Sequence, residues 1–356
     1  MIYRHWKTNR IINEEHFVDV PLRRHQTARF HRGHLHSALL QHVPPELIHL
    51  NKRVTGAKVS ADKVTLYFAD GTSAEGDVLV GADGIHSKVR AAFVPNHKLK
   101  WTGKVFARST FDASLVEGIK DLPADSTHWW GPNENFFASR LGQNQYTTVG
   151  NFDVDPTTPE GSLPAWNSEG DVGYLRQRYR DWNPVVRALI DATPYTRLYP
   201  NWAGEPLSTW VFGSRATLVG DAAHTHGGAF AAGGSLAIDD AYALYLAFRH
   251  VFLSTKLTDA SVGRIEKALA LYDRIRRPHT ERLLKIVLNN NSNNKTIGKD
   301  DIVNAEDVLV QRIKNKPDTT WLSEHDVEKA FQNVIRDDDA SIKGRHAAEV
   351  RGGSRL

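Results

Sequence analysis

The 356-residue sequence contains no cysteine and a single methionine. Without cysteine the chain cannot form disulfides, use a thiolate nucleophile or build a cysteine zinc site. Its first residues include no apolar h-region, so we expect no signal peptide. The longest apolar helical stretch, Leu236 to Leu253, contains two Asp and one Arg. It is too short and too charged to span a bilayer.

Strong charge of either sign is also missing. The formal net charge is +4, with 24% charged and 40% hydrophobic residues, which is ordinary for a globular protein. This balance does not indicate a nucleic-acid partner, although a weakly basic surface can attract small anions. Several histidines lie close together in the first fifty residues, but no cysteine or carboxylate has suitable ligand spacing, so we expect no metal. They are His25, His31, His34, His36, His42 and His49.

The most informative stretch begins at Ala216 and runs through Gly-Asp-Ala-Ala-His at 220–224 into a loop of small residues. A short apolar strand, this loop and an amphipathic helix starting after Ser235 follow one another. Glycines such as Gly233 and Gly234 let a backbone lie close against a flat ligand. The helix offers unpaired N–H groups and its positive dipole end to negative charge. Together these features suit a reduced flavin.

Three motifs in order resemble the FAD-dependent aromatic hydroxylases, the single-component, salicylate-hydroxylase-like monooxygenases of fungal type. The first is Gly-Asp-Ala-Ala-His at 220–224 with the glycines and helix after it. The second is Asp-Val-Leu-Val-Gly-Ala-Asp-Gly-Ile-His-Ser-Lys-Val-Arg at 77–90, a buried strand followed by a helix near Ser87. The third is Arg-Phe-His-Arg-Gly-His-Leu at 29–35. The resemblance covers most of residues 1 to 290.

The resemblance implies roles for particular residues. Arg108 lies on an expected strand where the family's arginine faces the substrate cavity, although an alternating strand can equally point it outward. His224 and His226 are expected to form hydrogen bonds within the loop rather than to act as acid–base catalysts. The residues implied to contact the cofactor are Arg32, Asp83, Gly84, Gly220, Asp221, Gly233 and Gly234.

Gly-x-Gly-x-x-Gly, which the family uses to hold the ADP pyrophosphate at a helix N-terminus, is absent from the whole sequence. No segment before Arg29 is long enough for the βαβ unit that carries it. We therefore expect an N-terminally truncated family member, or a natural short form, that binds FAD poorly as written.

The expected fold class is α/β: an FAD-binding, Rossmann-like domain of glutathione-reductase type that lacks its first βαβ unit and has an inserted β-rich substrate domain. Strands are expected at 48–50, 53–60, 63–68 and 78–80, and a long helix at 262–289 with a kink at Pro278. The expected parts are a hairpin of the substrate domain (1–20), FAD-binding segments (21–95 and 213–290), the substrate domain (96–212) and a partly disordered extension (291–356).

The activity implied by the resemblance is hydroxylation of an aromatic or phenolic small molecule with FAD, NAD(P)H and O2, in the cytoplasm and without a membrane span. Two other classes stay open. One is a catalytically impaired flavoprotein remnant that acts as a binding module, and the other is a flavin oxidoreductase without oxygen insertion. The sequence leaves open the substrate, the choice of NADH or NADPH, and the oligomeric state.

Overall fold

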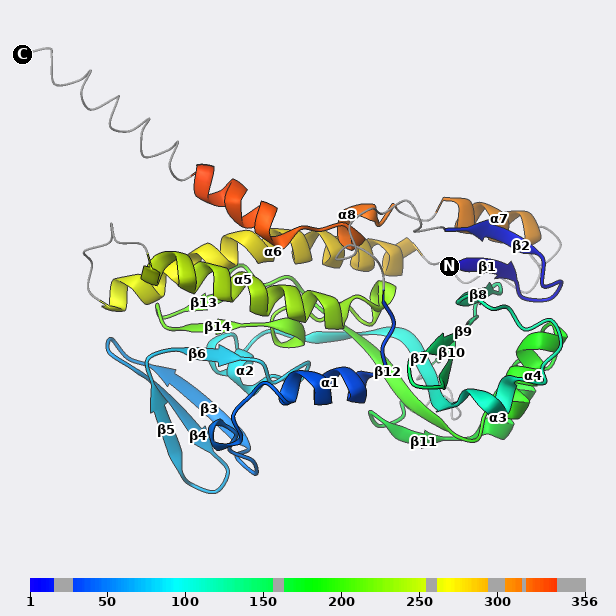
Figure 1. The fold of residues 1–356 in the computed structure, drawn as a ribbon, viewed down its shortest axis with the longest axis horizontal. Helices are drawn as coiled ribbons and strands as arrows, with labels where there is room; N and C mark the ends of the chain where they lie inside the picture. The colour runs from blue at the N-terminus through cyan, green and yellow to red at the C-terminus, as the bar shows by residue number, and fades with distance from the viewer. Residues whose placement is uncertain (16–27, 156–162, 254–260, 294–304, 316–317, 338–356) are drawn as a thin grey trace, which may run out of the picture. The chain divides into compact units, whose positions relative to one another are not determined.

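The structure is a computed structural model that describes residues 1–15, 28–155, 163–253, 261–293, 305–315 and 318–337. The chain divides into two compact units (Figure 1). Unit 1 comprises Met1–Ile48, Trp101–Asn201 and Asn294–His325. Unit 2 comprises His49–Lys100, Trp202–Asn293 and Asp326–Leu356.

Unit 1 is built around an eight-stranded sheet with the order β11-β12-β7-β10-β9-β8-β1-β2. Its centre is a meander of antiparallel strands, in which β10 pairs with both β7 and β9. The alternation of buried and accessible residues along β7 and β10 is the period-two pattern of a sheet with one face in a core. The strands are β1 (Ile2–His5), β2 (Ile11–Glu14), β7 (Leu99–Asp112), β8 (Thr127–Trp130), β9 (Asn135–Leu141), β10 (Gln145–Asp153), β11 (Ser168–Gly170) and β12 (Thr196–Gly204).

The core of unit 1 lies on one face of this sheet, where α3 (Val172–Arg178) and α4 (Pro184–Ala192) contribute Tyr179, Val186 and Leu189 and their neighbours. Asn183 caps α4 by accepting hydrogen bonds from the Val185 and Val186 amides. Trp129 is fully buried in this core, and its indole N–H donates to Asn9 Oδ1 at 2.8 Å. Trp129 is therefore a packing residue of the sheet.

The first strands of the chain belong to the same sheet. β1 pairs with β2 as the expected hairpin and, on its other side, runs parallel to β8. Helix α7 (Ala305–Lys314) contributes Leu309 and Ile313 to a small cluster around Tyr3. α1 (Arg32–Leu40) also falls in unit 1 by contact clustering and has no buried residue.

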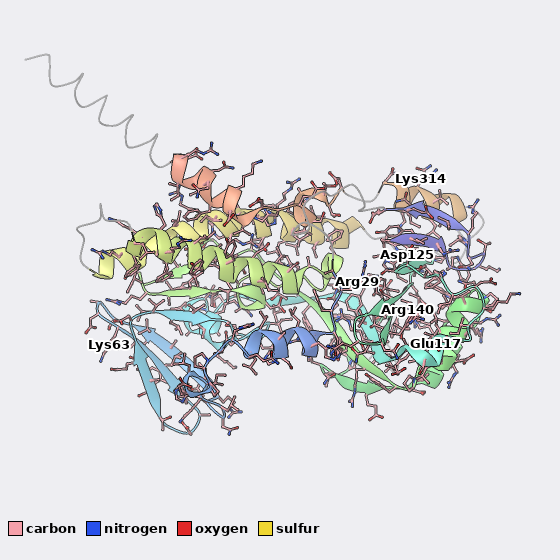
Figure 2. All side chains as sticks on the ribbon, in the orientation of Figure 1. Arg29, Lys63, Glu117, Asp125, Arg140 and Lys314 are labelled. Carbon is pink, nitrogen blue, oxygen red and sulfur yellow. The ribbon has the colours of Figure 1, made fainter. Side chains whose placement is uncertain are left out.

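Unit 2 contains two three-stranded sheets. In one, β6 (Leu79–Gly81) runs parallel to β14 (Ala216–Leu218), and β13 (Val211–Phe212) pairs with the other side of β14. The other is the meander β3 (Val54–Val59), β4 (Val64–Phe68) and β5 (Ser73–Gly76). Near the β3–β4 turn of the meander lies Lys63, which pairs with Glu75 (Figure 2).

Two long helices pack against each other in unit 2: α5 (Gly233–Leu253) and α6 (Ser261–Asn293), with Pro278 inside α6. Ala243, Ala247 and Tyr272 from these helices enter one core with Leu79 and Leu218 from the parallel strands. A shorter helix, α2 (Lys88–Phe93), follows β6 and is capped by Ser87. This places the two loops that follow β6 and β14 at the carboxyl ends of neighbouring parallel strands, where open α/β sheets bind ligands.

Several local expectations need correction. The expected strand at 48–50 is not formed, because Pro45–Leu47 makes a 3-10 turn and the side chain of Leu50 is 77% exposed with no strand beside it. The strand expected at 78–80 lies at Leu79–Gly81, and its Val80 side chain is 38% exposed rather than buried. α5 begins at Gly233, before Ser235. The expected division into FAD-binding and substrate parts stays a prediction.

The C-terminal region also differs from the expectation. α7, α8 (Thr320–Ser323) and a helix over 327–337 cover most of what the structure describes beyond residue 304. Within the extension at 291–356, which was expected to be partly disordered, residues 294–304, 316–317 and 338–356 lie outside the described residues. Among the helices that the structure describes, none is long and apolar enough to cross a membrane.

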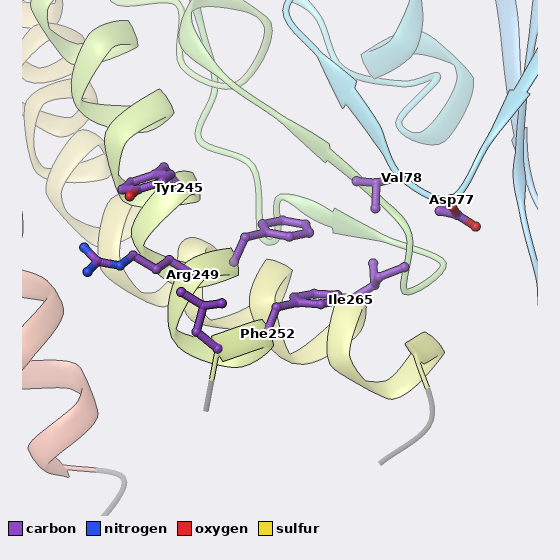
Figure 3. Close-up of a pocket in the computed structure, with 8 residues that line it drawn as sticks. Asp77, Val78, Tyr245, Arg249, Phe252 and Ile265 are labelled. Atoms are coloured by element: carbon purple, nitrogen blue, oxygen red, sulfur yellow. The ribbon is translucent and has the colours of Figure 1, made fainter. Parts of the chain in front are cut away.

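A cavity of about 650 Å³ in unit 2 lies between α5, the start of α6 and the residues before β6 (Figure 3). Its lining is mostly apolar and includes Tyr245, Phe252 and Ile265, with Asp77 and Arg249 at its rim. Asp77 and Val78 precede β6, so this cavity is at the amino end of the parallel strands. The loops with the sequence motifs are at the opposite, carboxyl end.

Gly81 offers a test of the packing between β6 and β14. A Cβ at Gly81 would lie 2.6 Å from a Leu218 side-chain atom and 2.8 Å from Val89. We expect Gly81→Ala to destabilise unit 2 by about 1–3 kcal/mol, as overpacking does in a dense core. Gly76→Ala is the control, because only one atom approaches that position, at 3.9 Å. Equal urea midpoints for the two variants would contradict this packing.

Candidate active site

The Gly-Asp-Ala-Ala-His motif forms a tight turn at the end of β14. Gly220 has φ +59°, and a Cβ on it would lie 3.1 Å from the Ala237 Cβ on α5, so the position favours glycine in both conformation and space. The Gly220 carbonyl accepts hydrogen bonds from the Ala223 and His224 amides, each at 2.9 Å. The turn is thereby held closed and packed against α5.

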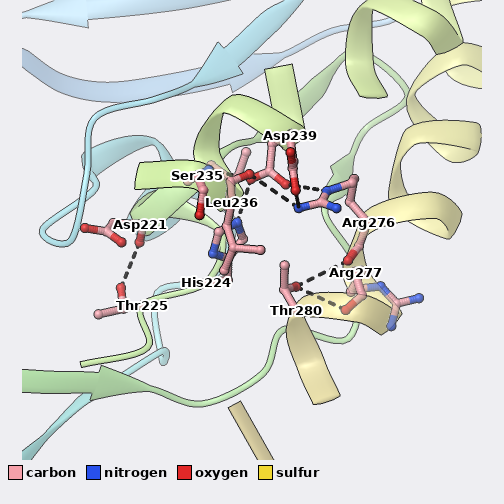
Figure 4. Close-up of polar contacts among 12 residues, drawn as sticks. Asp221, His224, Thr225, Ser235, Leu236, Asp239, Arg276, Arg277 and Thr280 are labelled. Carbon is pink, nitrogen blue, oxygen red and sulfur yellow. Dashed lines mark hydrogen bonds and ion pairs between the residues drawn. The ribbon is translucent and has the colours of Figure 1, made fainter. Parts of the chain in front are cut away.

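Asp221 leaves this turn with an exposed side chain. Its carbonyl accepts a hydrogen bond from the Thr225 hydroxyl at 2.8 Å (Figure 4). Its carboxylate reaches the start of α5, where Oδ1 is 3.7 Å from the place that a Cβ on Gly233 would take. Nothing lies within 4 Å of the corresponding place on Gly234. The structure thus brings Gly220, Asp221 and Gly233 together and leaves open space at Gly234.

The loop after β6 carries Asp83 and Gly84. Gly84 has φ +78°, in the left-handed region, which suits glycine. Asp83 has a structural role of its own, because its carboxylate accepts hydrogen bonds from the Lys88 and Val89 amides and from the Ser87 hydroxyl. It therefore caps α2. A flavin contact of Asp83, implied by the resemblance, stays a prediction.

Arg90 joins the two loops. Its guanidinium is buried and donates to the carbonyls of Ala222 at 2.9 Å and Asp221 at 3.2 Å, and to that of Ile85 at 2.5 Å. One cation on α2 therefore holds the loop after β6 and the turn after β14 in a common arrangement. Loss of hydration lowers the pKa of Arg90, while the charges of Asp83 and Asp221 oppose that shift.

A buried charge network lies behind the turn, on α5 and α6 (Figure 4). The Asp240 carboxylate is fully buried and accepts hydrogen bonds from the Gly220 amide at 2.8 Å, from His224 Nε2 at 2.5 Å and from Arg276 Nε at 2.8 Å. Burial alone would raise the pKa of Asp240, but His224 and Arg276 outweigh it and hold the pKa below its ordinary value. Burial also raises the pKa of Asp239, which is 3.5 Å from Arg276, to about 6.

His226 lies beside this network, with its ring centroid 4.8 Å from that of His224. It is 3% exposed, and burial followed by the neighbouring His224 lowers its pKa to about 3. It is therefore neutral at physiological pH. His224 packs against Trp210 at 5.3 Å. His224 forms its side-chain hydrogen bond with Asp240 on α5, and neither ring nitrogen of His226 has a hydrogen-bond partner among the described residues, so the side-chain hydrogen bonds expected within the loop are not observed.

In unit 1, Arg108 lies on the face of β7 that does not meet the core. Its neighbours Ala107 and Ser109 are buried, whereas Arg108 is exposed. The guanidinium carbon lies 5.7 Å from the ring centres of both Phe106 and Tyr199. Among the described residues no carboxylate pairs with it. Arg108 therefore points to the face of β7 opposite the core, and its contact with a substrate stays a prediction.

Arg32, at the first position of α1, is exposed. Loss of hydration lowers the pKa of Arg108, Tyr199 opposes that change, and the charge of Arg32 adds to the lowering. Arg32 and Arg108 thus contribute to one positive field in unit 1. The flavin contact implied for Arg32 stays a prediction.

Sequence reasoning missed the residues that hold the loops. Arg90 is the last residue of the motif at 77–90, and its position three residues after the cap Ser87 was the available signal. Asp240 lies in the helix that follows the Gly-Asp-Ala-Ala-His motif. Arg276 had no signal, because its partner Asp240 lies 36 residues away on another helix. Among the described residues no group of His, Asp and Glu side chains has the arrangement of a metal site.

No family model matches the sequence. Among individual proteins, the chain is 31% identical over 263 residues to 3-hydroxybenzoate 6-hydroxylase 2 of Aquipseudomonas alcaligenes, covering 72% of this chain and 76% of that protein. It is 30% identical over 260 residues to 6-hydroxynicotinate 3-monooxygenase of Bordetella bronchiseptica, covering 72% and 63%. A crystal structure of Klebsiella pneumoniae HpxO with FAD and uric acid superposes with TM-score 0.68 at 23% identity, covering 94% of this chain and 79% of that one.

The parallel strands with their motif loops, joined to a β-rich unit, define the fold class of the flavin-dependent hydroxylases. The chain belongs to the family of FAD-dependent aromatic hydroxylases. The predicted α/β fold with a β-rich second domain is thereby confirmed. The matched region spans 52% to 71% of the length of the first curated relatives.

The depressed pKa of His226 predicts a specific acid sensitivity. An unfolded histidine binds a proton near pH 6.5, whereas folded His226 does so only near pH 3. Its stabilising contribution is therefore present above pH 6.5 and is lost as the pH falls towards 3. Between pH 7 and pH 5 we expect His226→Gln to lose about 2 kcal/mol less unfolding free energy than the wild type.

Urea denaturation at the two pH values measures this difference. The control is His42→Gln, because His42 is exposed. Asp239, which titrates near pH 6, is present in every protein compared, so its contribution cancels. Parallel losses of stability in the wild type and in His226→Gln would show that His226 is not held neutral by the fold.

Proposed function

We propose that this protein is an NAD(P)H- and FAD-dependent monooxygenase that hydroxylates an aromatic or phenolic small molecule. The observation that carries the proposal is the turn at Gly220, which presents the Asp221 carboxylate opposite the first turn of α5. A carboxylate there can accept hydrogen bonds from the hydroxyls of a ribityl chain. The helix N-terminus favours the negative charge of a reduced flavin ring.

The residues of unit 2 fit the flavin end of FAD. Gly234 is exposed and has nothing within 4 Å of its Cβ position, so a flat ring can approach the backbone there. The pyrophosphate end has no matching glycine loop in the 356 residues. Asp83 and Gly84, on the neighbouring loop, are the other proposed cofactor contacts. When bound and reduced by NAD(P)H, FAD would activate O2, so that one oxygen atom is transferred to the aromatic ring and the other leaves as water.

Arg108 is the proposed substrate-orienting residue. Its exposed guanidinium lacks a carboxylate partner among the described residues and can make charge-assisted hydrogen bonds to a phenolate or carboxylate. The rings of Phe106 and Tyr199, at 5.7 Å, hold the guanidinium in place and offer an apolar surface beside it. Fixing the ring in one orientation selects which carbon reacts. A cytoplasmic location, where NAD(P)H is abundant, belongs to the same proposal.

A second candidate is a flavoprotein-like binding module without catalysis. The visible absorption of the purified chain titrated with FAD separates the two, because a module that holds no flavin stays colourless. A flavin oxidoreductase without oxygen insertion would bind FAD and oxidise NAD(P)H but yield no hydroxylated product. Product mass analysis under oxygen, over a panel of phenols and aromatic acids, distinguishes it from a monooxygenase.

The Asp221 assignment predicts the effect of one isosteric change. We expect Asp221→Asn to weaken FAD binding at least tenfold, because the amide is a poorer acceptor for ribityl hydroxyls and carries no charge. Fluorescence titration with FAD measures the affinity. Asp62→Asn is the control, since Asp62 is an exposed acid in the β3–β4 turn that accepts a hydrogen bond from Ser60. Equal affinities in the two variants reject the ribityl contact.

The Arg108 assignment predicts a separation of cofactor and substrate effects. We expect Arg108→Gln to raise the KM for an aromatic acid at least tenfold while leaving FAD affinity within twofold, because the cation contacts only the substrate. NAD(P)H oxidation with and without the aromatic acid measures this. Arg140→Gln, an exposed arginine at the end of β9, is the control (Figure 2). Unchanged substrate dependence returns Arg108 to a surface role.

A further inference from the structure

The buried carboxylate of Asp240 touches the backbone of the candidate flavin turn. Its Oδ2 accepts a hydrogen bond from the Gly220 amide, and its Oδ1 accepts one from Arg276. The core that α5 and α6 form with the parallel strands consists of apolar residues. A charge in such a place is costly unless it is fully paired, and an apolar residue would serve packing equally well. Packing alone therefore does not explain why an acidic residue occupies this position.

We propose that Asp240 is a positioning residue that sets the Gly220 turn, and through it the direction of Asp221, with Arg276 and His224 holding its carboxylate in place. This rests on the proposed flavin-binding function of that turn. Asp240 itself has no access to a ligand, since its side chain is fully buried.

The first support is the register of α5. Gly233, Ala237 and Asp240 are spaced by four and three residues and so lie on one face of the helix. Each of them meets the turn: Gly233 lies near the Asp221 carboxylate, Ala237 lies against Gly220, and Asp240 accepts from the Gly220 amide. Three contacts along one helix face fix the turn relative to α5. Of these contacts, the one made by Asp240 is a hydrogen bond, from the Gly220 amide at 2.8 Å.

The second support is the completeness of the hydrogen bonding. The Gly220 carbonyl is held by the Ala223 and His224 amides, and the Asp221 carbonyl by Arg90 and Thr225. The Gly220 amide would be an unpaired buried donor without Asp240, because Gly220 itself is buried. The strand just before the turn is also fixed from α6, where the Tyr272 hydroxyl donates to the Leu218 carbonyl at 2.9 Å. Removing the Asp240 carboxylate thus leaves the Gly220 amide, at the start of the turn, without its acceptor.

The third support is that the acceptor must be a carboxylate. Both Asp240 oxygens accept, one from Arg276 and the other from the Gly220 amide and His224. An amide side chain offers one acceptor oxygen, so its NH2 group would face a donor on one side. Because a carboxylate can only accept a hydrogen bond, His224 donates from Nε2 in this contact.

Helix α6 provides a matched control pair, Asp273 and Arg277. Asp273 is a buried acid that accepts a hydrogen bond from the Trp210 amide at 2.8 Å and pairs with Arg277 at 2.9 Å. It resembles Asp240 in burial and in having an arginine partner, but none of its hydrogen bonds reaches the Gly220 turn. A purely structural role of buried acids predicts similar effects for Asp240→Asn and Asp273→Asn. A positioning role predicts different effects.

The first experiment needs no ligand. Hydrogen–deuterium exchange of the full chain is compared for the wild type, Asp240→Asn and Asp273→Asn. We expect exchange of the segment 218–224 to rise at least tenfold in Asp240→Asn and less than twofold in Asp273→Asn, with the β3–β4 hairpin unchanged in both. Unchanged exchange of 218–224 in Asp240→Asn, or an equal rise in both variants, would overturn the proposal.

A double variant tests whether the effect of Asp240→Asn arises only from misfolding. Asp240→Asn alone removes the closer of the two acids that pair with the buried Arg276 and leaves Asp239 at 3.5 Å, so Asp240→Asn combined with Arg276→Gln removes both charges of the buried pair. We expect the double variant to regain thermal stability to the level of Asp273→Asn while the segment 218–224 still exchanges faster than in the wild type. Full recovery of protection would show that the turn needs only a neutral, packed network, and would overturn the role of the carboxylate.

FAD titration then separates this proposal from the proposed function. If the wild type binds FAD, we expect an at least tenfold loss of affinity in Asp240→Asn and in the double variant, and at most a twofold loss in Asp273→Asn. Equal losses in Asp240→Asn and Asp273→Asn count against positioning. A wild type that binds no FAD at any concentration rejects the proposed function, and the exchange experiment still decides whether Asp240 sets the turn.

Discussion

The hydrogen bond between the buried Asp240 carboxylate and the Gly220 amide is the constraint on which the arrangement of unit 2 depends. It links the end of β14 to α5, and the pairing of Asp240 with Arg276 extends the link to α6. A buried ion pair adds little net stability, because desolvation offsets most of the Coulomb attraction. Its effect is geometric, since removing either partner leaves a charge that the surrounding core cannot accommodate.

The two candidate cofactor loops are therefore held from behind, and the side that faces a ligand stays open. Arg90 binds their carbonyl groups, Asp240 binds the amide of Gly220, and Asp83 is used to cap α2. The Asp221 carboxylate and the backbone at Gly234 remain accessible. A site that must accept a large planar cofactor needs such a rigid support, because binding then costs little ordering of the loops.

Much of this architecture could be predicted from the sequence, because it depends on local patterns. Gly-Asp-Ala-Ala-His after an apolar strand indicated a loop of small residues followed by a helix, and Arg108 was expected on a strand. The support of the turn could not be predicted, since the partners of Asp240 come together only when α5 packs on α6. The strand expected at 48–50 failed for a similar reason: apolar residues favour a strand only where another strand is present to pair with them.

In the proposed function, the two units take different tasks. The hydrogen bonds to the Asp221 carbonyl come from Arg90 and Thr225 in unit 2, whereas Arg108 is flanked by Phe106 and Tyr199 in unit 1. We therefore expect a substitution on the exposed face of β7 to leave the hydrogen bonds around Gly220 intact. If Arg108 orients the substrate as proposed, the preference for one aromatic ring over another can change without disturbing the network around Asp240, as long as the core beneath β7 keeps its packing.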